Sequence, residues 1–306
     1  MRLCLDWSHR NKRCAYKTIV SLAPTPHFSL SVFLFVCAML KAMINICLAG
    51  ATGWTGRALA LALQSSNEFN LVSAVARQTA GQDLGEVLEG SHWGVPIYNT
   101  VAEALDGAQV LIDYTSHSSV KSNILIGIEH GVHGIVGSSG LTSSDFEEIH
   151  EKAVGKNVGV VAAGNFAITA AMAQAAALLV AKHLPTWEVI DYASATKPDV
   201  PSGTARELAE RLSAVHRPAI GVPVKDIAGP QEARGADIDG TLVHSVRLPS
   251  FVVSTETVFG LPDERLTIRF DAGSSPTPYV AGTLIAAKAV IDRVGLVRGL
   301  DTLLLS

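Results

Sequence analysis

Between Ile44 and Asn165, short apolar runs alternate with stretches in which apolar and polar residues recur at helical spacing. The apolar runs predict buried strands at 44–50, 71–77, 110–115, 132–139 and 158–165. The stretches between them predict helices at 56–66, 120–131 and 142–155. Strands and helices that alternate in this way are typical of a parallel sheet covered by helices.

The pattern changes after Asn165. The runs that follow predict, in order, an alanine-rich helix, a strand, a helix, two long strand-like runs and a last helix, at 168–184, 187–195, 202 onward, 241–260, 264–273 and 278–294. Hairpin-like strands after a parallel set indicate a second domain, to which the last helix need not belong.

We therefore predict an α/β protein of two domains. A Rossmann-type dinucleotide-binding domain spans 43–165 plus 285–306, because the last helix is expected to return to it. A second domain of α+β type spans 166–284.

The first 42 residues differ from the rest of the chain. They hold six Lys and Arg against one acidic residue, three of the four cysteines, and an apolar segment at 28–40. A basic stretch before an apolar one suggests a signal peptide, but this segment is short for a membrane span and a predicted strand follows directly. We favour the interpretation that Met43 is the natural start and that 1–42 are a non-native or disordered leader.

Composition narrows the function classes. The formal net charge of −4 gives no bulk basic character for binding nucleic acid. Cys47 is the one cysteine after residue 42, which fits a protein of the reducing cytoplasm. The ten histidines are scattered without ligand spacing, so no metal site is predicted. We expect a cytoplasmic protein that binds neither nucleic acid nor membrane.

The first chemical motif is the glycine-rich stretch GATGWTG. It lies between a predicted strand and a predicted helix, where glycines permit a tight turn and the helix N-terminus offers N–H groups to a pyrophosphate. A purely structural turn is the weaker alternative, because the motif opens a strand–helix–strand unit. The candidate cofactor residues here are Gly50, Thr52, Gly53, Trp54, Thr55 and Gly56.

The end of the second strand bears on the choice between NADH and NADPH. An acidic residue there accepts hydrogen bonds from the ribose of NAD, whereas a basic residue meets the 2′-phosphate of NADP. This chain has Ala76 and Arg77 and no acid. The prediction is NADPH, with NADH possible, although Arg77 is also compatible with stacking on adenine or facing solvent.

Small polar residues stand at the ends of three later strands. Carboxyl ends of parallel strands line the ligand crevice, so these residues are candidates for surrounding a nicotinamide. Ordinary turn residues, a helix N-cap and a core aromatic are the competing interpretations. The candidates are Thr115, Gly137, Ser138, Ser139, Asn165 and Phe166.

The stretch KPDVPSGTA predicts an anion site. Ser202 is a suitable N-cap for the helix that begins at Gly203, and Lys197 is close in sequence. A helix N-terminus beside a lysine suits a carboxylate or phosphate. The competing interpretation is a capped helix with a solvated lysine.

Over about residues 43–306, the chain resembles the dihydrodipicolinate reductase (4-hydroxy-tetrahydrodipicolinate reductase) family of lysine biosynthesis. The resemblance rests on seven motifs that occur in the family's order: GATGWTG, DYT, GSSG, AGNF, KPDVPSGTA, HSVRLP and ERLTIRF. The resemblance implies an NAD(P)H-binding Rossmann domain and a substrate domain whose open mixed sheet usually builds a homotetramer; a dimer is the other possibility. It implies that the glycine turn holds the pyrophosphate and that Arg77 lies at the adenosine end. It also implies that Lys197, Ser202, Gly203 and Thr204 bind a substrate carboxylate.

The chain departs from the family signature E-x-H-H-x-x-K-x-D-x-P-S-G-T at the histidine pair. Ala193 and Ser194 stand there, and Asp191 replaces the leading glutamate. In the family the first histidine is the proposed proton donor and the second helps to bind substrate. We keep Ser194 as a substrate-binding candidate and predict Lys197 as the catalytic residue that supplies the proton.

Weaker candidates for the proton are Tyr192 and solvent water, and His244 is expected to be structural. Three functions stay open. The first is a divergent dihydrodipicolinate reductase, and the second is a reductase or amine dehydrogenase of the same fold with another imino, keto or amino acid substrate. The third is a non-catalytic protein that binds NADPH and serves assembly.

Overall fold

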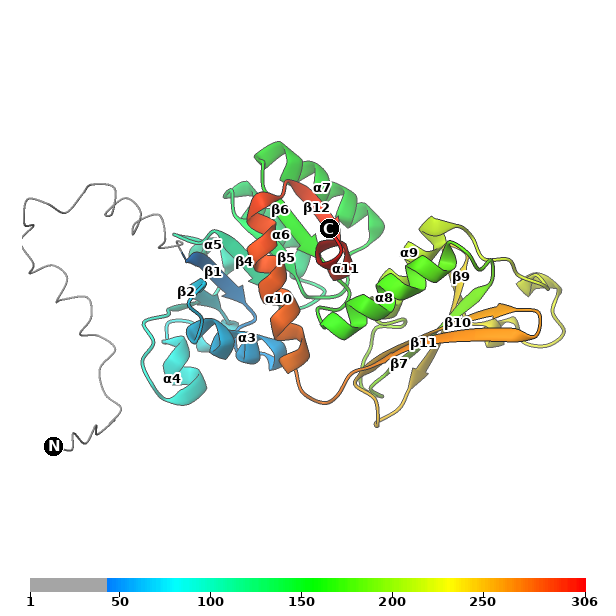
Figure 1. Ribbon diagram of the computed structural model, residues 1–306. Coiled ribbons are helices and arrows are strands. Elements are labelled where there is room, and N and C mark those ends of the chain that lie inside the picture. Colours follow the sequence, from blue (N-terminus) through cyan, green and yellow to red (C-terminus); the bar gives the residue numbers. More distant parts are fainter. Residues whose placement is uncertain (1–42) are drawn as a thin grey trace, which may run out of the picture. The chain divides into compact units, whose positions relative to one another are not determined.

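The computed structural model describes residues 43–306, so the predictions for the leader at 1–42 lie outside the described residues. The first sheet has seven parallel strands in the order β12-β6-β5-β4-β1-β2-β3 (Figure 1). They are β1 (Ile44–Ala49), β2 (Phe69–Val75), β3 (Ile97–Tyr98), β4 (Val110–Asp113), β5 (His133–Val136), β6 (Gly159–Ala162) and β12 (Gly295–Arg298). The chain runs outward in opposite directions from β1, which creates a crevice between β1 and β4, the place where such sheets bind nucleotides.

Helices cover both faces of this sheet. Along β1, Ile46 and Leu48 join one core and Cys47 and Ala49 join the other, which is why the strand is apolar throughout. The first core includes residues of α3 (Trp54–Gln64), α4 (Leu84–Glu89), α10 (Thr277–Ala289) and α11 (Leu300–Leu304). The second includes residues of α5 (Val101–Ala104), α6 (Val120–Glu129) and α7 (Ser143–Lys156).

The second sheet is open and mixed, in the order β11-β10-β7-β9-β8, with β7 and β9 parallel and the other pairs antiparallel. Its strands are β7 (Trp187–Ala193), β8 (Ala236–Ile238), β9 (Thr241–Arg247), β10 (Val253–Leu261) and β11 (Glu264–Asp271). The helices α8 (Ile168–Ala181) and α9 (Gly203–Val215) pack on one face of it (Figure 1). This arrangement confirms the predicted fold class.

Two predictions about single elements are wrong. The run at 241–260 is not one strand: it is interrupted after Arg247, where Pro249 cannot donate a ladder hydrogen bond, and β10 begins at Val253. The last helix ends at Ala289 instead of continuing to 294. The chain then forms β12, which pairs with β6 at the edge of the first sheet.

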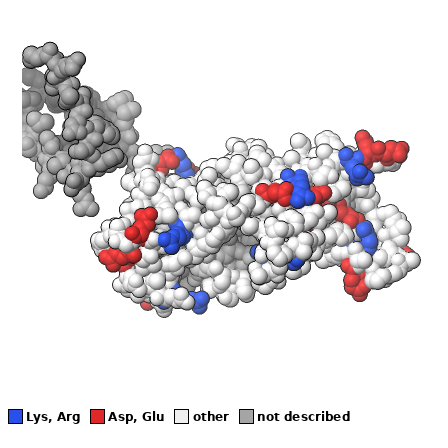
Figure 2. Space-filling view, turned by 90° about the horizontal axis from the view of Figure 1, so that it is seen from below, with Lys and Arg blue, Asp and Glu red and all other residues white. Residues whose placement is uncertain are grey.

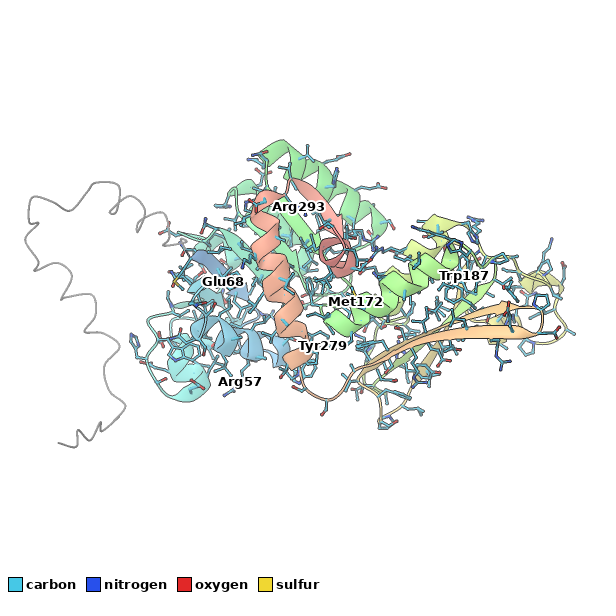
Figure 3. All side chains as sticks on the ribbon, viewed as in Figure 1. Arg57, Glu68, Met172, Trp187, Tyr279 and Arg293 are labelled. Carbon is cyan, nitrogen blue, oxygen red and sulfur yellow. The ribbon has the colours of Figure 1, made fainter. Side chains whose placement is uncertain are left out.

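Helix α10 packs with α3 against the first sheet. Its first turn carries Tyr279, which lies beside α3 in Figure 3 and makes an edge contact with Trp54 at a ring-centroid distance of 5.9 Å. Farther along, Lys288 forms an ion pair with Glu68. In residues 43–306, no helix combines the length and the apolar content needed to cross a bilayer.

Candidate active site

The glycine motif forms a tight turn between β1 and α3. Gly53 is the N-cap of α3 and offers no side-chain cap, so the first N–H groups of the helix stay available to a ligand. A Cβ atom at Gly56 would collide with the carbonyl oxygen of Gly50. The turn therefore depends on glycine for its close packing.

A cavity of about 740 Å³ opens beside this turn. It extends from the glycine motif, past the ends of β2 and β4, to α6. It brings together the predicted residues Gly50, Thr52, Gly53, Arg77 and Thr115. Arg77 is the one charged residue that lines it, so within the described chain no carboxylate stands where an NAD ribose would be held.

Asp113 fixes the strand ends beside this cavity. Its buried carboxylate accepts hydrogen bonds from the Thr115 amide (3.0 Å) and hydroxyl (2.8 Å), from the Ser138 hydroxyl (2.9 Å) and from the Asn123 side chain (2.8 Å). The acid ties the loop after β4 to the loop after β5. It thereby orients two of the predicted nicotinamide residues.

Tyr114 packs between α10 and Phe166, which follows β6. Its hydroxyl forms a 2.8 Å hydrogen bond with the Thr283 hydroxyl on α10, and a Cβ atom at Gly137 would collide with its ring. Burial raises the pKa of the Tyr114 phenol well above its usual value. Tyr114 is therefore a neutral part of the wall of the site.

A smaller cavity of about 260 Å³ lies where the two domains meet. Its walls are loops after β5 and β6, the N-termini of α3 and α9, and the start of β10. It brings together the predicted residues Trp54, Thr55, Gly137, Ser138, Ser139, Asn165, Phe166, Lys197, Ser202, Gly203 and Thr204. Prediction from sequence missed five apolar or aromatic residues of the same wall, Tyr114, Ala163, Val252, Val253 and Tyr279.

The N-terminus of α9 faces this cavity. The Ser202 hydroxyl caps the Ala205 amide at 3.3 Å, and the Arg206 amide bonds to the Ser202 carbonyl at 2.9 Å. First-turn amides of a helix have no partner within the helix, so those of Gly203 and Thr204 are left for a ligand. The Asn165 amide donates to the Thr204 hydroxyl (3.3 Å) and links this turn to the end of β6.

Asp191 holds this helix terminus in place. It is fully buried on β7 and accepts hydrogen bonds from the Ser202 amide (2.8 Å), the Ser202 hydroxyl (2.7 Å), the Ser245 hydroxyl (3.1 Å) and the Arg247 guanidinium (2.8 Å). We predicted no role for Asp191 from the sequence. The available signal was an acid, Asp191, at a position that alternation along the strand places on the same face as its buried apolar side chains.

Lys197 is the one cation that lines the smaller cavity. Its Nζ lies 2.8 Å from Asp199 Oδ1, and its side chain is 30% exposed. The cavity therefore combines one ammonium group, one helix N-terminus and several hydroxyls, which is a suitable set of donors for a carboxylate.

Three other candidates do not line the cavity. The Ser194 hydroxyl lies 3.1 Å from that of Thr196. Tyr192 points to the opposite face of the sheet from Asp191, where its hydroxyl donates to Glu256 (3.3 Å) and burial raises its pKa. His244 lies on that face too, with its Nε2 2.7 Å from Glu188.

Outside the two cavities, neither surface charge nor metal-ligand residues indicate a further site in the described residues. On the face drawn in Figure 2, basic side chains lie next to acidic ones and most of the surface is uncharged. Among residues 43–306, no group of three or more His, Cys, Asp or Glu is placed to hold a metal ion.

Comparisons with known proteins agree with this geometry. The family model for the dihydrodipicolinate reductase N-terminus matches residues 44–166, and that for its C-terminus matches residues 164–304. The 4-hydroxy-tetrahydrodipicolinate reductase of Moorella thermoacetica is 34% identical over 267 residues, covering 86% of this chain and 98% of the relative. That of Geobacillus kaustophilus is 34% identical over 269 residues, covering 85% and 99%.

The chain belongs to the dihydrodipicolinate reductase family. A solved structure of a dipicolinate-bound dihydrodipicolinate reductase from Paenisporosarcina sp. TG-14 matches with a TM-score of 0.66 and 25% identity, covering 85% of this chain and 99% of the other. An amine dehydrogenase from Mycobacterium smegmatis shares the fold, with a TM-score of 0.58, 19% identity and coverage of 84% and 95%. Family membership makes this chain an NAD(P)H-dependent oxidoreductase of the dihydrodipicolinate reductase type.

Proposed function

We propose that the chain reduces a carboxylated cyclic imine with NAD(P)H, as a 4-hydroxy-tetrahydrodipicolinate reductase of lysine and diaminopimelate biosynthesis. One observation carries this proposal. The 260 Å³ cavity sets the N-terminus of α9 and Lys197 opposite the strand-end loops of the dinucleotide-binding domain. A carboxylate donor set thus faces the place where a nicotinamide ring belongs.

The substrate carboxylate binds at the start of α9. The free amides of Gly203 and Thr204 donate to it, and the Lys197 ammonium supplies the charge. Ser202 acts mainly by shaping the turn, because its amide and hydroxyl already bond to Asp191. Ser194 contributes only if its side chain turns away from Thr196.

NADPH is the preferred cofactor in this proposal, and NADH is the second choice. A bound NAD(P)H supplies the hydride. Gly50, Gly53 and Gly56 hold the pyrophosphate, and Arg77 pairs with the 2′-phosphate at the far end of the 740 Å³ cavity. The loops that carry Thr115, Gly137, Ser138, Ser139, Asn165 and Phe166 frame the nicotinamide and its ribose.

Lys197 supplies the proton in this proposal. Ala193 is fully buried and Ser194 does not line the cavity, so neither replaces the proposed proton-donating histidine of the family. Lys197 is the one ionisable side chain that lines the cavity besides the partly buried Tyr114 and Tyr279. Burial raises the pKa of both phenols, which makes them weaker acids than an ordinary tyrosine.

A second candidate function is the reduction of another imino or keto acid, or an amine dehydrogenase reaction. The observation that favours it is the apolar wall around the missing histidine pair, where Val253 pairs with Ala193 across the sheet. We further propose a cytoplasmic homo-oligomer, a tetramer or a dimer, built through the face of the second sheet that α8 and α9 leave uncovered. The partly buried Ile190, Val246 and Val258 lie on that face.

Turnover tests the proposed function. Purified full-length protein is mixed with NADPH and freshly prepared 4-hydroxy-tetrahydrodipicolinate, and the loss of NADPH absorbance is followed. Rapid oxidation that depends on both the imine and the enzyme is expected. The first candidate function would be contradicted if protein that binds NADPH in calorimetry showed no oxidation above background. A panel of cyclic imines, and of keto acids with ammonia, would then test the second candidate function.

A further inference from the structure

Lys197 forms an ion pair with Asp199, a residue to which the proposed reaction assigns no role. Asp199 Oδ1 lies 2.8 Å from Lys197 Nζ, and the two side chains are 33% and 30% exposed. Asp199 does not line the 260 Å³ cavity. It lines a neighbouring cavity of about 470 Å³, together with Pro198 and Pro201. The carboxylate therefore contacts the ammonium from outside the substrate cavity.

The main chain at Asp199 is anchored firmly. Its carbonyl accepts a hydrogen bond from Arg247 Nη2 at 2.8 Å, and the same nitrogen lies 2.8 Å from the buried carboxylate of Asp191. Pro198 and Pro201 restrict φ on either side. The backbone of Asp199 is thus tied to the same buried acid that positions the N-terminus of α9.

The carboxylate of Asp199 has few other partners. Its Oδ2 is buried and has no hydrogen-bond donor among the described residues. A buried carboxylate oxygen without a donor is unfavourable, so the ion pair with Lys197 is the main compensation for this charge. An ion pair that both partners need keeps the long lysine side chain in one place.

We propose that Asp199 is a positioning residue that holds the Lys197 ammonium group at the edge of the substrate cavity, ready to protonate the reduced ring. This inference rests on the proposed function. In the step it serves, one N–H bond of the ammonium breaks and one N–H bond forms at the ring nitrogen. Lys197 is left as a neutral amine and regains its proton from solvent. Asp199 takes no proton and touches no substrate.

The variant Asp199→Asn tests the inference, because it keeps the shape and removes the charge. We expect kcat to fall by about 10- to 100-fold, a part of what a well-placed acid contributes. The dissociation constant of NADPH should stay within about threefold, because Asp199 does not line the cofactor cavity. That of dipicolinate should rise, but by less than in Lys197→Met, because Asp199 holds the ammonium group that binds the carboxylate. Asp263→Asn, in the turn between β10 and β11 where φ is +64°, removes an equal charge from the surface and should change nothing.

A double variant separates positioning from a general effect on the loop. If Asp199 acts through Lys197, Lys197→Met and Lys197→Met/Asp199→Asn should have the same single-turnover rate within about twofold. An equal further loss in the Lys197→Met background would overturn the inference, and so would an unchanged kcat in Asp199→Asn. If Asp199→Asn does not fold, Asp199→Glu serves, since it keeps the charge but moves it, and the same kcat loss is expected. Turnover by the wild-type protein reports separately on the proposed function.

Discussion

Two helices, α3 and α9, begin at the walls of the two cavities described above, and their N-termini are held in different ways. The start of α3 has no side-chain cap and depends on the close approach of Gly56 to Gly50. The start of α9 is capped by Ser202, which a buried carboxylate, Asp191, holds against the second sheet. The start of α3 thus depends on glycines that lack side chains, whereas the start of α9 depends on a network of buried polar groups.

The largest effect is expected from Gly56→Val. The new Cβ would collide with the Gly50 carbonyl, so the turn must open and the amides at the start of α3 must move. We expect NADPH affinity to fall by about 100-fold or more, since each 1.4 kcal/mol is a factor of ten. Calorimetry measures it, with Gly155→Ala as a control at a glycine whose Cβ meets nothing and whose φ is not positive. Unchanged NADPH affinity would show that the turn does not need close packing.

The second effect is expected from Asp191→Asn. Loss of the carboxylate charge leaves Arg247 without its buried partner. Breaking a buried ion pair costs about 3–5 kcal/mol, so we expect the free energy of unfolding to fall by about that much. Denaturant unfolding measures it. The matched control is Glu188→Gln on the same strand, whose ion pairs with Arg234 and His244 are partly exposed and should contribute about 0–1 kcal/mol. Equal losses of unfolding free energy in both variants would contradict a special role of Asp191 at the start of α9.

The third effect concerns the adenosine end of the α3 site. Arg77→Ala should weaken NADPH binding by about tenfold, because one charge-assisted contact to the 2′-phosphate is lost. NADH binding should stay within about twofold, since that cofactor lacks the phosphate. Steady-state kinetics with the two cofactors measure the ratio. An equal loss for both would show that Arg77 stacks on the adenine instead.

The smallest effect comes from a third helix N-terminus, that of α7, which serves no ligand in this account. Thr142 and Asp145 form a capping box, and Lys121 pairs with the acid at 2.6 Å. Asp145→Asn should cost about 1 kcal/mol of stability and leave both ligand affinities unchanged. Altered affinity for NADPH or dipicolinate would show that this terminus is not merely structural.

The same variant has a pH dependence of known sign. The hydrogen bonds from Lys121 and Thr142 lower the pKa of Asp145 from 3.8 to about 2. A carboxyl whose pKa is lower in the folded state stabilises above its unfolded pKa and loses that contribution as pH falls. The difference between wild type and Asp145→Asn should therefore shrink between about pH 4 and pH 2. A constant difference across that range would contradict this assignment.

Features that depend on neighbouring residues were predicted from the sequence. The glycine turn, the strand ends at Thr115 and Ser138, and the cap at Ser202 are local patterns, and the structure places each of them beside a cavity. Family membership and the two-sheet fold agree with the predictions as well.

Features that depend on distant residues were not predicted. Asp191 bonds to residues 11, 54 and 56 positions away, and no local pattern reveals that pairing. The same holds for β12, a four-residue strand that is stable only because β6 lies beside it. Tyr192 was a candidate proton donor because it is near Lys197 in sequence, but alternation along β7 turns it to the other face of the sheet.

The central claim is that Lys197 and the start of α9 form the carboxylate site beside the cofactor. Calorimetric titration of dipicolinate into the NADPH-bound protein tests it most directly. The account predicts clear binding to wild type and a loss of about 30-fold or more in Lys197→Met, because a desolvated charge pair contributes about 2–5 kcal/mol. Equal dipicolinate affinity in the two proteins would contradict the account.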